Sequence, residues 1–335
     1  MRWLVLLLAL LGATGNMTVA RQSPPGIRQA SIVPYQDARF LAFFTGGQLL
    51  AIAGNSQLEV YDVSDPDDPF SVVTAPLSGE IRALAGAGDL LLFALELDDE
   101  ADELIVAGPD RYRPEGYGLL NSLLIPAGTS EIEVSPDTGW ALIAGDDGYM
   151  MARIMSADRI QSSALIPTGD APLVAAALTR NNALMIHEDR AQLVQKPLST
   201  TIQDQVSETA LDLPAEATAL ALDTDAGIAA IALENGDLTL VDLETLTILE
   251  TLTIEDGPAS EIVFLAQDER TYLALLLEEA EQVLVLDITD PAANITTTAV
   301  DLDIDDDDVT LAGYGDVLAI ADDAGVILLQ LEPSE

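Results

Sequence analysis

The sequence has no cysteine, only one histidine and few aromatic residues. The absence of cysteine excludes disulfide bonds and thiolate metal sites. A single histidine also excludes zinc sites built on two or more imidazole ligands. Aromatic residues make up 4% of the chain, so Leu, Ala, Ile and Val must supply most of the core. About half of the 335 residues are apolar, which is enough to bury a large hydrophobic interior.

Basic residues are scarce as well. One lysine and twelve arginines stand against 57 acidic residues, and the formal net charge is −44. Such a surface repels nucleic acids and anionic lipids, because both are bound through Lys and Arg. It suits high salt, divalent cations or basic partners. Salt adaptation and GC-rich coding would both deplete lysine, and the composition fits either cause.

Residues 1–20 have the pattern of a secretory signal peptide. Arg2 supplies a positive charge, residues 3–11 are an unbroken apolar run, and Thr18-Val19-Ala20 is a small-residue cleavage site. The run is too short to cross a hydrocarbon layer of about 30 Å; an uncleaved signal anchor is the alternative. We predict a mature chain of residues 21–335 that is secreted, periplasmic or at the surface of a prokaryotic cell. No later stretch has transmembrane length, so no membrane span is expected.

A short apolar strand pattern recurs along the mature chain. Its seven copies begin 43 to 46 residues apart, at Leu58, Leu104, Tyr149, Gln192, Leu238, Val283 and Val326. The apolar runs are short and bounded by Gly, Asp, Asn and Pro, which favours strands over helical repeats of similar length. A period near 45 residues fits a four-stranded propeller blade. The sequence therefore predicts an all-β fold, a single seven-bladed β-propeller over residues 21–335 with four antiparallel strands in each blade.

The two ends of the chain predict how the ring closes. The fifth repeat shows four strands, at 217–222, 228–233, 238–243 and 247–254. The last repeat supplies only three, at 309–313, 317–321 and 326–331. Residues 27–33 form an additional strand before the first inner strand at 40–44. We expect residues 27–33 to be the outer strand of the last blade, because an open ring leaves strand edges and apolar faces in water.

Two segments resemble the LVIVD-repeat family of prokaryotic β-propellers. They are Val60-Tyr-Asp-Val-Ser-Asp-Pro-Asp-Asp-Pro69 and Val285-Leu-Asp-Ile-Thr-Asp-Pro291, and the second has Ala292-Ala293-Asn294 in place of the family's second proline. A third segment, Val241-Asp-Leu-Glu-Thr245, is more like general WD40/YVTN-like propellers. The resemblance implies a propeller and no particular reaction. The aspartates of the motif are expected to accept hydrogen bonds in turns.

No catalytic motif is present. The sequence has no Walker loop, dinucleotide fingerprint or nucleophile elbow. His187 is expected to be an ordinary loop histidine, and Met150, Met151 and Met155 are expected to pack in the core rather than bind copper. Residues 223–227 resemble the start of an EF-hand loop but lack its bidentate glutamate.

Acidic residues gather in the loops predicted for one face of the ring, which we call the upper face. It carries the loops from second to third strands and the links from each outer strand to the next inner strand. Acidic residues occur in six of the seven second-to-third loops: Asp98, Asp99, Glu100, Asp146, Asp147, Glu188, Asp189, Glu234, Asp237, Glu278, Glu279, Asp322 and Asp323. The run Asp305, Asp306, Asp307 and Asp308 falls in a link on the same face. Most basic loop residues are predicted on the opposite, lower face: Arg111, Arg113, Arg159, Arg180, Lys196 and Arg270.

These clusters are either solvated turns or a surface that binds cations or a basic partner. Carboxylate oxygens favour Ca²⁺ over transition metals, so Asp305 to Asp308 with Asp322 and Asp323 are the candidate Ca²⁺ ligands. No other cofactor is expected. The leading functional hypothesis is an exported, monomeric, non-catalytic scaffold that binds a protein or a small ligand. The alternative is a Ca²⁺-dependent propeller hydrolase or lyase of the lactonase kind, which convergent inner-strand carboxylates would favour.

Thermal melts in NaCl and CaCl₂ at equal ionic strength separate the two interpretations of the acidic clusters. Salt screens repulsion between exposed charges over roughly 10 Å at 0.1 M, so both salts should raise the melting temperature. Solvated turns respond equally to the two salts. A Ca²⁺ site adds stabilisation at millimolar CaCl₂, because the ion binds only the folded state. Superimposable curves would remove the Ca²⁺ site.

Overall fold

The computed structural model describes most of the chain after residue 25. The described residues are 26–35, 37–54, 57–98, 101–110, 113–135, 139–145, 148–156, 159–163, 165–167, 173–178, 182–188, 190–195, 208–224, 226–267, 269–290, 295–301, 309–322 and 325–332.

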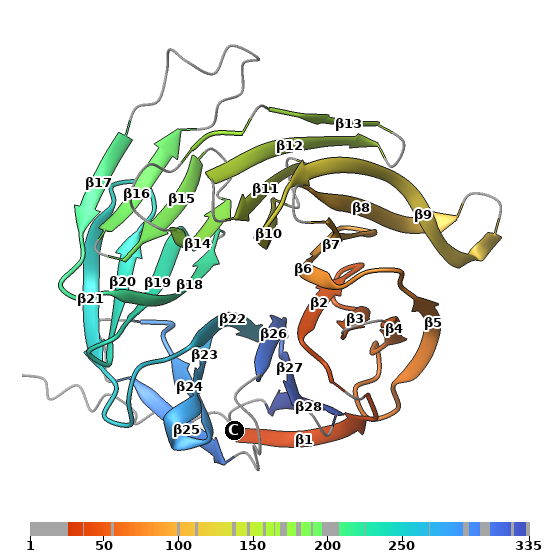
Figure 1. Ribbon diagram of the computed structural model, residues 1–335. Coiled ribbons are helices and arrows are strands. Elements are labelled where there is room, and N and C mark those ends of the chain that lie inside the picture. Colours follow the sequence, from red (N-terminus) through yellow and green to blue (C-terminus); the bar gives the residue numbers. More distant parts are fainter. Residues whose placement is uncertain are drawn as a thin grey trace, which may run out of the picture.

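The described strands form seven four-stranded antiparallel sheets, set as blades around a central axis (Figure 1). Blade 1 is β2 (Phe40–Phe44), β3 (Leu49–Ala53), β4 (Gln57–Asp62) and β5 (Phe70–Pro76); blade 2 is β6 (Ile81–Ala87), β7 (Leu90–Asp98), β8 (Ala101–Asp110) and β9 (Arg113–Pro126); blade 3 is β10 (Thr129–Ser135), β11 (Trp140–Gly145), β12 (Gly148–Ser156) and β13 (Arg159–Ser162). Blade 4 is β14 (Leu173–Leu178), β15 (Asn182–His187), β16 (Arg190–Gln195) and β17 (Glu208–Asp212); blade 5 is β18 (Ala217–Asp223), β19 (Ile228–Leu233), β20 (Asp237–Asp242) and β21 (Thr247–Thr253). Blade 6 is β22 (Glu261–Gln267), β23 (Arg270–Leu277), the 3₁₀ turn η1 (Glu278–Ala280), β24 (Gln282–Asp287) and β25 (Thr296–Asp301); blade 7 is β26 (Thr310–Tyr314), β27 (Val317–Asp322), β28 (Gly325–Glu332) and β1 (Gly26–Val33). The fold is the predicted seven-bladed propeller, and the seven recurring segments lie on the third strand of each blade.

The first strand of the chain closes the ring. β1 pairs antiparallel with β28, with Ile27 opposite Leu331 and Val33 opposite Val326, as predicted from the missing fourth strand. In Figure 1 this strand, in red, lies on the rim beside the blue last blade. Ser31 Oγ also donates a 2.6 Å hydrogen bond to the Pro66 carbonyl of blade 1. β1 therefore completes blade 7 and ties it to blade 1.

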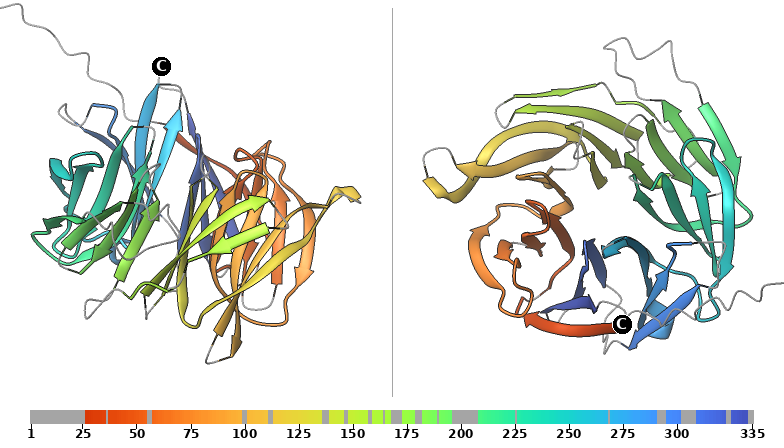
Figure 2. Two further views of the ribbon diagram at one scale, coloured as in Figure 1. Left: turned by 90° about the horizontal axis from the view of Figure 1, so that it is seen from above. Right: turned by 180° about the vertical axis from the view of Figure 1, so that it is seen from behind.

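The hydrophobic interior consists of seven clusters, one in each interface between neighbouring blades. For example, Leu50 and Ile52 of blade 1 pack with Ala319 and Leu328 of blade 7. The second and third strands carry apolar side chains on both faces, because each face meets a neighbouring blade. In Figure 2 the strands run from one face of the ring to the other, so each interface extends through its thickness.

Small residues predominate on several inner strands, where the blades converge on the axis. Gly86 on β6 shows the constraint: a Cβ atom there would lie 2.0 Å from the Phe43 carbonyl oxygen on β2. Any side chain at this position would force blades 1 and 2 apart.

The motif aspartates hold turns, as the resemblance implied. Asp62 Oδ1 accepts hydrogen bonds from the Ser64 amide and hydroxyl. Asp242 accepts from two amides and a hydroxyl in its turn, and Asp287 accepts from the Thr289 amide. These carboxylates have local structural partners at strand ends. Among the described residues, no helix has the length and apolar character needed to cross a bilayer.

Removing β1 should destabilise the ring. A chain that begins at residue 35 lacks the partner of β28 and exposes the edge and the apolar face that β1 covers. We expect a lower melting temperature and concentration-dependent aggregation, measured by calorimetry and size-exclusion chromatography. A chain that begins at residue 26 keeps β1 and is the matched control. Equal stability of the two chains would contradict the role of β1 in closure.

Candidate functional site

The predicted Ca²⁺ ligands lie almost entirely outside the described residues. Asp305, Asp306, Asp307 and Asp308 fall in an undescribed link, and Asp323 falls in an undescribed second-to-third loop. The backbone of Asp322 ends β27 opposite Gly325. The Ca²⁺ site therefore stays a prediction. Within the described part of the chain, no three His, Asp or Glu side chains are grouped so that they could hold a metal ion.

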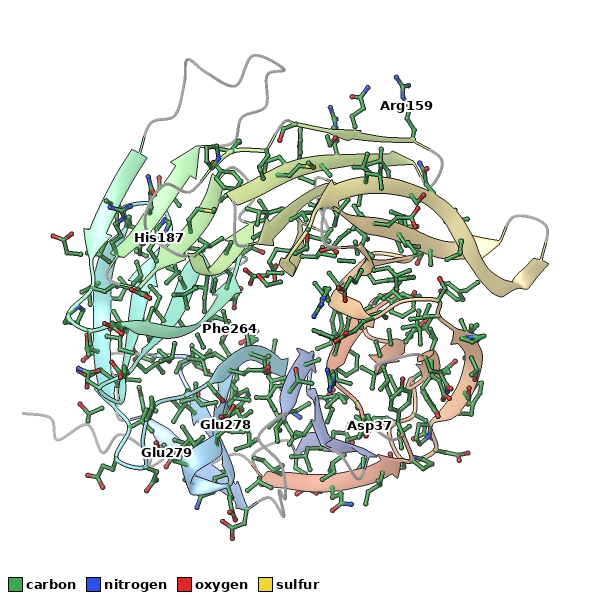
Figure 3. All side chains as sticks on the ribbon, in the orientation of Figure 1. Asp37, Arg159, His187, Phe264, Glu278 and Glu279 are labelled. Atoms are coloured by element: carbon green, nitrogen blue, oxygen red, sulfur yellow. The ribbon has the colours of Figure 1, made fainter. Side chains whose placement is uncertain are left out.

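Exposed carboxylates occur on both faces of the ring. On the upper face, Glu188, Glu234, Glu278 and Glu279 are exposed in second-to-third loops, and Figure 3 labels the last two on blade 6. On the lower face, exposed acids include Asp65, Asp67, Asp68, Asp89, Glu244 and Glu269. Of the predicted lower-face cations, Arg159 is exposed at the start of β13 and Arg270 is partly buried 3.6 Å from Asp287. Arg111, Arg180 and Lys196, and the side chain of Arg113, lie outside the description.

A cleft of about 450 Å³ opens at the inner rim of the upper face. It lies where the inner strands β2, β6 and β10 begin, so three successive blades contribute to it. Its lining residues are Arg39, Phe40, Glu80, Ile81, Arg82, Gly128, Thr129 and Ser130. The volume is within the range of small-ligand sites, roughly 300–1,000 Å³. None of the residues that line this cleft was predicted to be functional.

Two arginines face each other across one carboxylate in this cleft. Arg39 Nη1 lies 3.5 Å and Arg82 Nη1 lies 3.6 Å from the same oxygen, Glu80 Oε1. Arg82 Nη2 also donates a 2.6 Å hydrogen bond to Glu96. Both arginine side chains are 40% exposed. A guanidinium has five N–H donors, and within the described residues the acceptors of this pair are the carboxylates of Glu80 and Glu96.

β-bulges place extra residues at the upper ends of four inner strands. The strand register shifts around Arg82 on β6, Ser130 on β10, Val174 on β14 and Thr218 on β18. A bulge re-aims the side chain of its extra residue. Two of these residues, Arg82 and Ser130, line the cleft. The bulges therefore put polar groups at the rim while the rest of each strand keeps its alternation.

The side chains of two glutamates on β10, Glu131 and Glu133, lie toward blade 4 and not on the outer surface of the ring. Glu131 Oε2 accepts a 2.7 Å hydrogen bond from the Ala176 amide of β14. Side chains alternate along a strand, so Glu133 lies on the same face of β10. The small residues Ala175 and Ala176 of β14 leave space beside them. Both carboxylates are mostly enclosed and keep partial contact with water.

Enclosure by protein raises the pKa values of these carboxyl groups. Burial, reinforced by the charge of Glu133, raises the pKa of Glu131 to about 8, although the Ala176 amide acts in the opposite direction. Burial raises the pKa of Glu133 to about 7. Burial likewise raises the pKa of Glu261 on β22 to about 7, against hydrogen bonds from Leu311 and Thr310 of blade 7. These carboxyl groups titrate near neutrality.

His187 is an interior residue and not the loop residue that we predicted. It ends β15, is 2% exposed, and pairs in register with Leu173 on β14. The strand continues one residue further than its apolar run indicates. Met150 and Met151 pack into the clusters on either side of blade 3, as expected. The side chain of Met155 is outside the description.

Comparison with solved structures supports the fold and goes no further. The WD40 β-propeller domain of Doa1 superimposes with a TM-score of 0.66 at 14% identity, covering 92% of this chain and 98% of that chain. The chain is similar to that domain in architecture. No protein-family model and no curated protein matches the sequence. The resemblance to LVIVD repeats therefore stays a prediction.

Replacing Glu133 by Gln should change how stability depends on pH. A carboxyl whose folded-state pKa is above its ordinary 4.5 stabilises the fold below about pH 4.5, and this stability is lost as pH rises through about 7. Each pKa unit corresponds to about 1.4 kcal/mol, and water contact reduces the effect. We therefore expect the variant to be about 1–2 kcal/mol more stable than the wild type at pH 8 and equal to it at pH 4.5.

Chemical denaturation from pH 4.5 to 8.5 measures this difference. Glu188→Gln, which removes an exposed carboxylate from an upper-face loop, is the matched control and should leave the shape of the pH profile unchanged. Parallel profiles for Glu133→Gln and the wild type would show that Glu133 titrates normally.

Proposed function

We propose that this protein is an exported, non-catalytic propeller that binds a protein or small ligand through its upper face. The observation that carries the proposal is the cleft at the inner rim, where three blades supply ionic, hydroxyl and apolar groups to one concave site. The seven interfacial clusters hold these blades in fixed relation, so the site is preformed. Preformed sites avoid the ordering cost of binding.

The charge of the chain supports a partner that is basic or neutral overall. The net charge of −44 gives the upper face a negative field, and such a field attracts cationic partners and slows polyanions. Exposed carboxylates on blades 4, 5 and 6 lie on the part of this face across the ring from the cleft. We propose a monomeric extracellular or periplasmic scaffold, related to the LVIVD-repeat propellers, whose partner covers this face.

The described contacts favour this scaffold over the Ca²⁺-dependent hydrolase. Glu131 and Glu261 are inner-strand acids, the kind of residue that such an enzyme would use for metal binding. Each instead accepts a backbone amide of the next blade. Their hydrogen bonds join blades, and a bound cation would compete with them.

Partner capture with two charge variants tests the proposal. The upper-face variant carries Gln at Glu188, Glu234, Glu278 and Glu279, and the lower-face variant carries Asn or Gln at Asp68, Asp89, Glu244 and Glu269. The immobilised mature chain is exposed to the extracellular fraction of the source cells, and bound proteins and metabolites are quantified by mass spectrometry. We expect the upper-face variant to lose a partner that the lower-face variant retains. Loss in both variants, or retention in both, would contradict an upper-face site.

A further inference from the structure

We propose that the cleft at the inner rim binds a carboxylate group through Arg39 and Arg82. This inference rests on the proposed function, because it specifies the chemistry of the same face. Among the charged residues that line the cleft, two are arginines and one is a glutamate. With Glu96, which pairs with Arg82 at 2.6 Å, the four charged groups of this cluster balance. The site is therefore locally neutral in a chain whose net charge is −44.

The geometry of the pair leaves donors available to a ligand. Glu80 lies 3.5 and 3.6 Å from the two guanidinium groups, which is long for an ion pair. Guanidinium groups bind carboxylates through two parallel N–H donors. A ligand carboxylate can replace Glu80 as the acceptor of one group or bridge both. Thr129 and Ser130, at the start of β10, also line the cleft.

The surroundings restrict the rest of the ligand. Phe40 and Ile81 give the cleft an apolar component, which favours an apolar group next to the carboxylate. Exposed acids elsewhere on the upper face repel additional negative charge. The ligand class that fits is a monocarboxylate with an apolar substituent, either a free small molecule or the C-terminus of a peptide.

Nuclear magnetic resonance of the mature chain with methyl labels on Ile and Thr tests the site. The probe is N-acetylphenylalanine, and its amide is the control that lacks the negative charge. We expect the acid to shift the Ile81 and Thr129 methyl resonances, and the amide to bind about tenfold more weakly, because a charge-assisted hydrogen bond contributes about 1.5–3 kcal/mol. Citrate should bind more weakly than the monocarboxylate. Equal affinity for the acid and the amide would overturn the inference.

Three variants assign the binding to the arginines. Arg39→Gln with Arg82→Gln should weaken binding of the acid about tenfold or more, and Arg82→Lys should recover only part of it, because Lys has no planar fork. Arg159→Gln removes an exposed arginine on the outer rim (Figure 3) and should not alter binding. A melting temperature within the wild-type range shows that each variant is folded. Unchanged affinity in the folded double variant would overturn the inference.

Two further comparisons show whether the carboxylate belongs to a small molecule or to a peptide, and whether the inference or the proposed function has failed. An acetylated pentapeptide with a free C-terminus, compared with its amidated form, shows whether a peptide end reaches the cleft. If only the small acid binds, the ligand is a free molecule. If the double arginine variant keeps carboxylate binding while the upper-face acidic variant loses its partner, the inference fails and the proposed function stands. If neither variant affects any ligand, both fail.

Discussion

The pairing of β1 with β28 is the contact on which the rest of the ring depends. Each blade is a thin sheet whose two faces are apolar, and it has no interior of its own. Its faces are buried only because a blade lies on either side. Without β1, the interface between blades 7 and 1 would lose Val33, and apolar surface that β1 covers would contact water. Closure also fixes blade 1 relative to blade 3, and the cleft is built from both.

Carboxylates within the ring complement this apolar packing. Buried Asp102 of blade 2 accepts the Thr129 amide of blade 3 at 3.0 Å. Glu131 and Glu261 make equivalent bonds from blade 3 to blade 4 and from blade 6 to blade 7. The amide hydrogen bond partly offsets the desolvation cost of burying each of these carboxyl groups. Part of the acidity of this chain therefore serves the joints between blades.

The framework of the fold could be predicted from the sequence because it follows from the repeat period and the apolar alternation of the strands. Apolar runs spaced by 43 to 46 residues marked the third strand of each blade. The strand missing from the last repeat matched the additional strand at the start of the mature chain. Alternation alone could not place Glu131 and Glu133. A polar stripe on a strand predicts contact with water, and it does not say whether that water is outside the ring or between two blades.

The cleft was missed for a related reason. Arg82 and Ser130 face the rim because each is the extra residue of a bulge, and a bulge leaves no mark on the hydrophobic pattern of its strand. Arg39 lies in a link and Arg82 lies inside an apolar inner strand, so neither belonged to the loop arginines that were compared between faces. An arginine within an inner strand of a chain with only twelve arginines was the available signal. The predicted Ca²⁺ ligands Asp305 to Asp308 and Asp323 lie outside the described residues, so their placement does not bear on this comparison.

The position of the arginine pair explains how an acidic scaffold can bind an anion selectively. Close contacts in the cleft act over a few ångströms and are set by two guanidinium groups and the carboxylates of Glu80 and Glu96. The field of the other carboxylates acts over longer distances and is screened beyond roughly 10 Å at 0.1 M salt. A ligand with one carboxylate gains the close contacts and meets little of the opposing field. Each further negative charge must lie outside the cleft, where it gains no guanidinium contact and still meets the field of the acidic chain. The same net charge that repels polyanions thus leaves a small, locally neutral site selective for a single carboxylate.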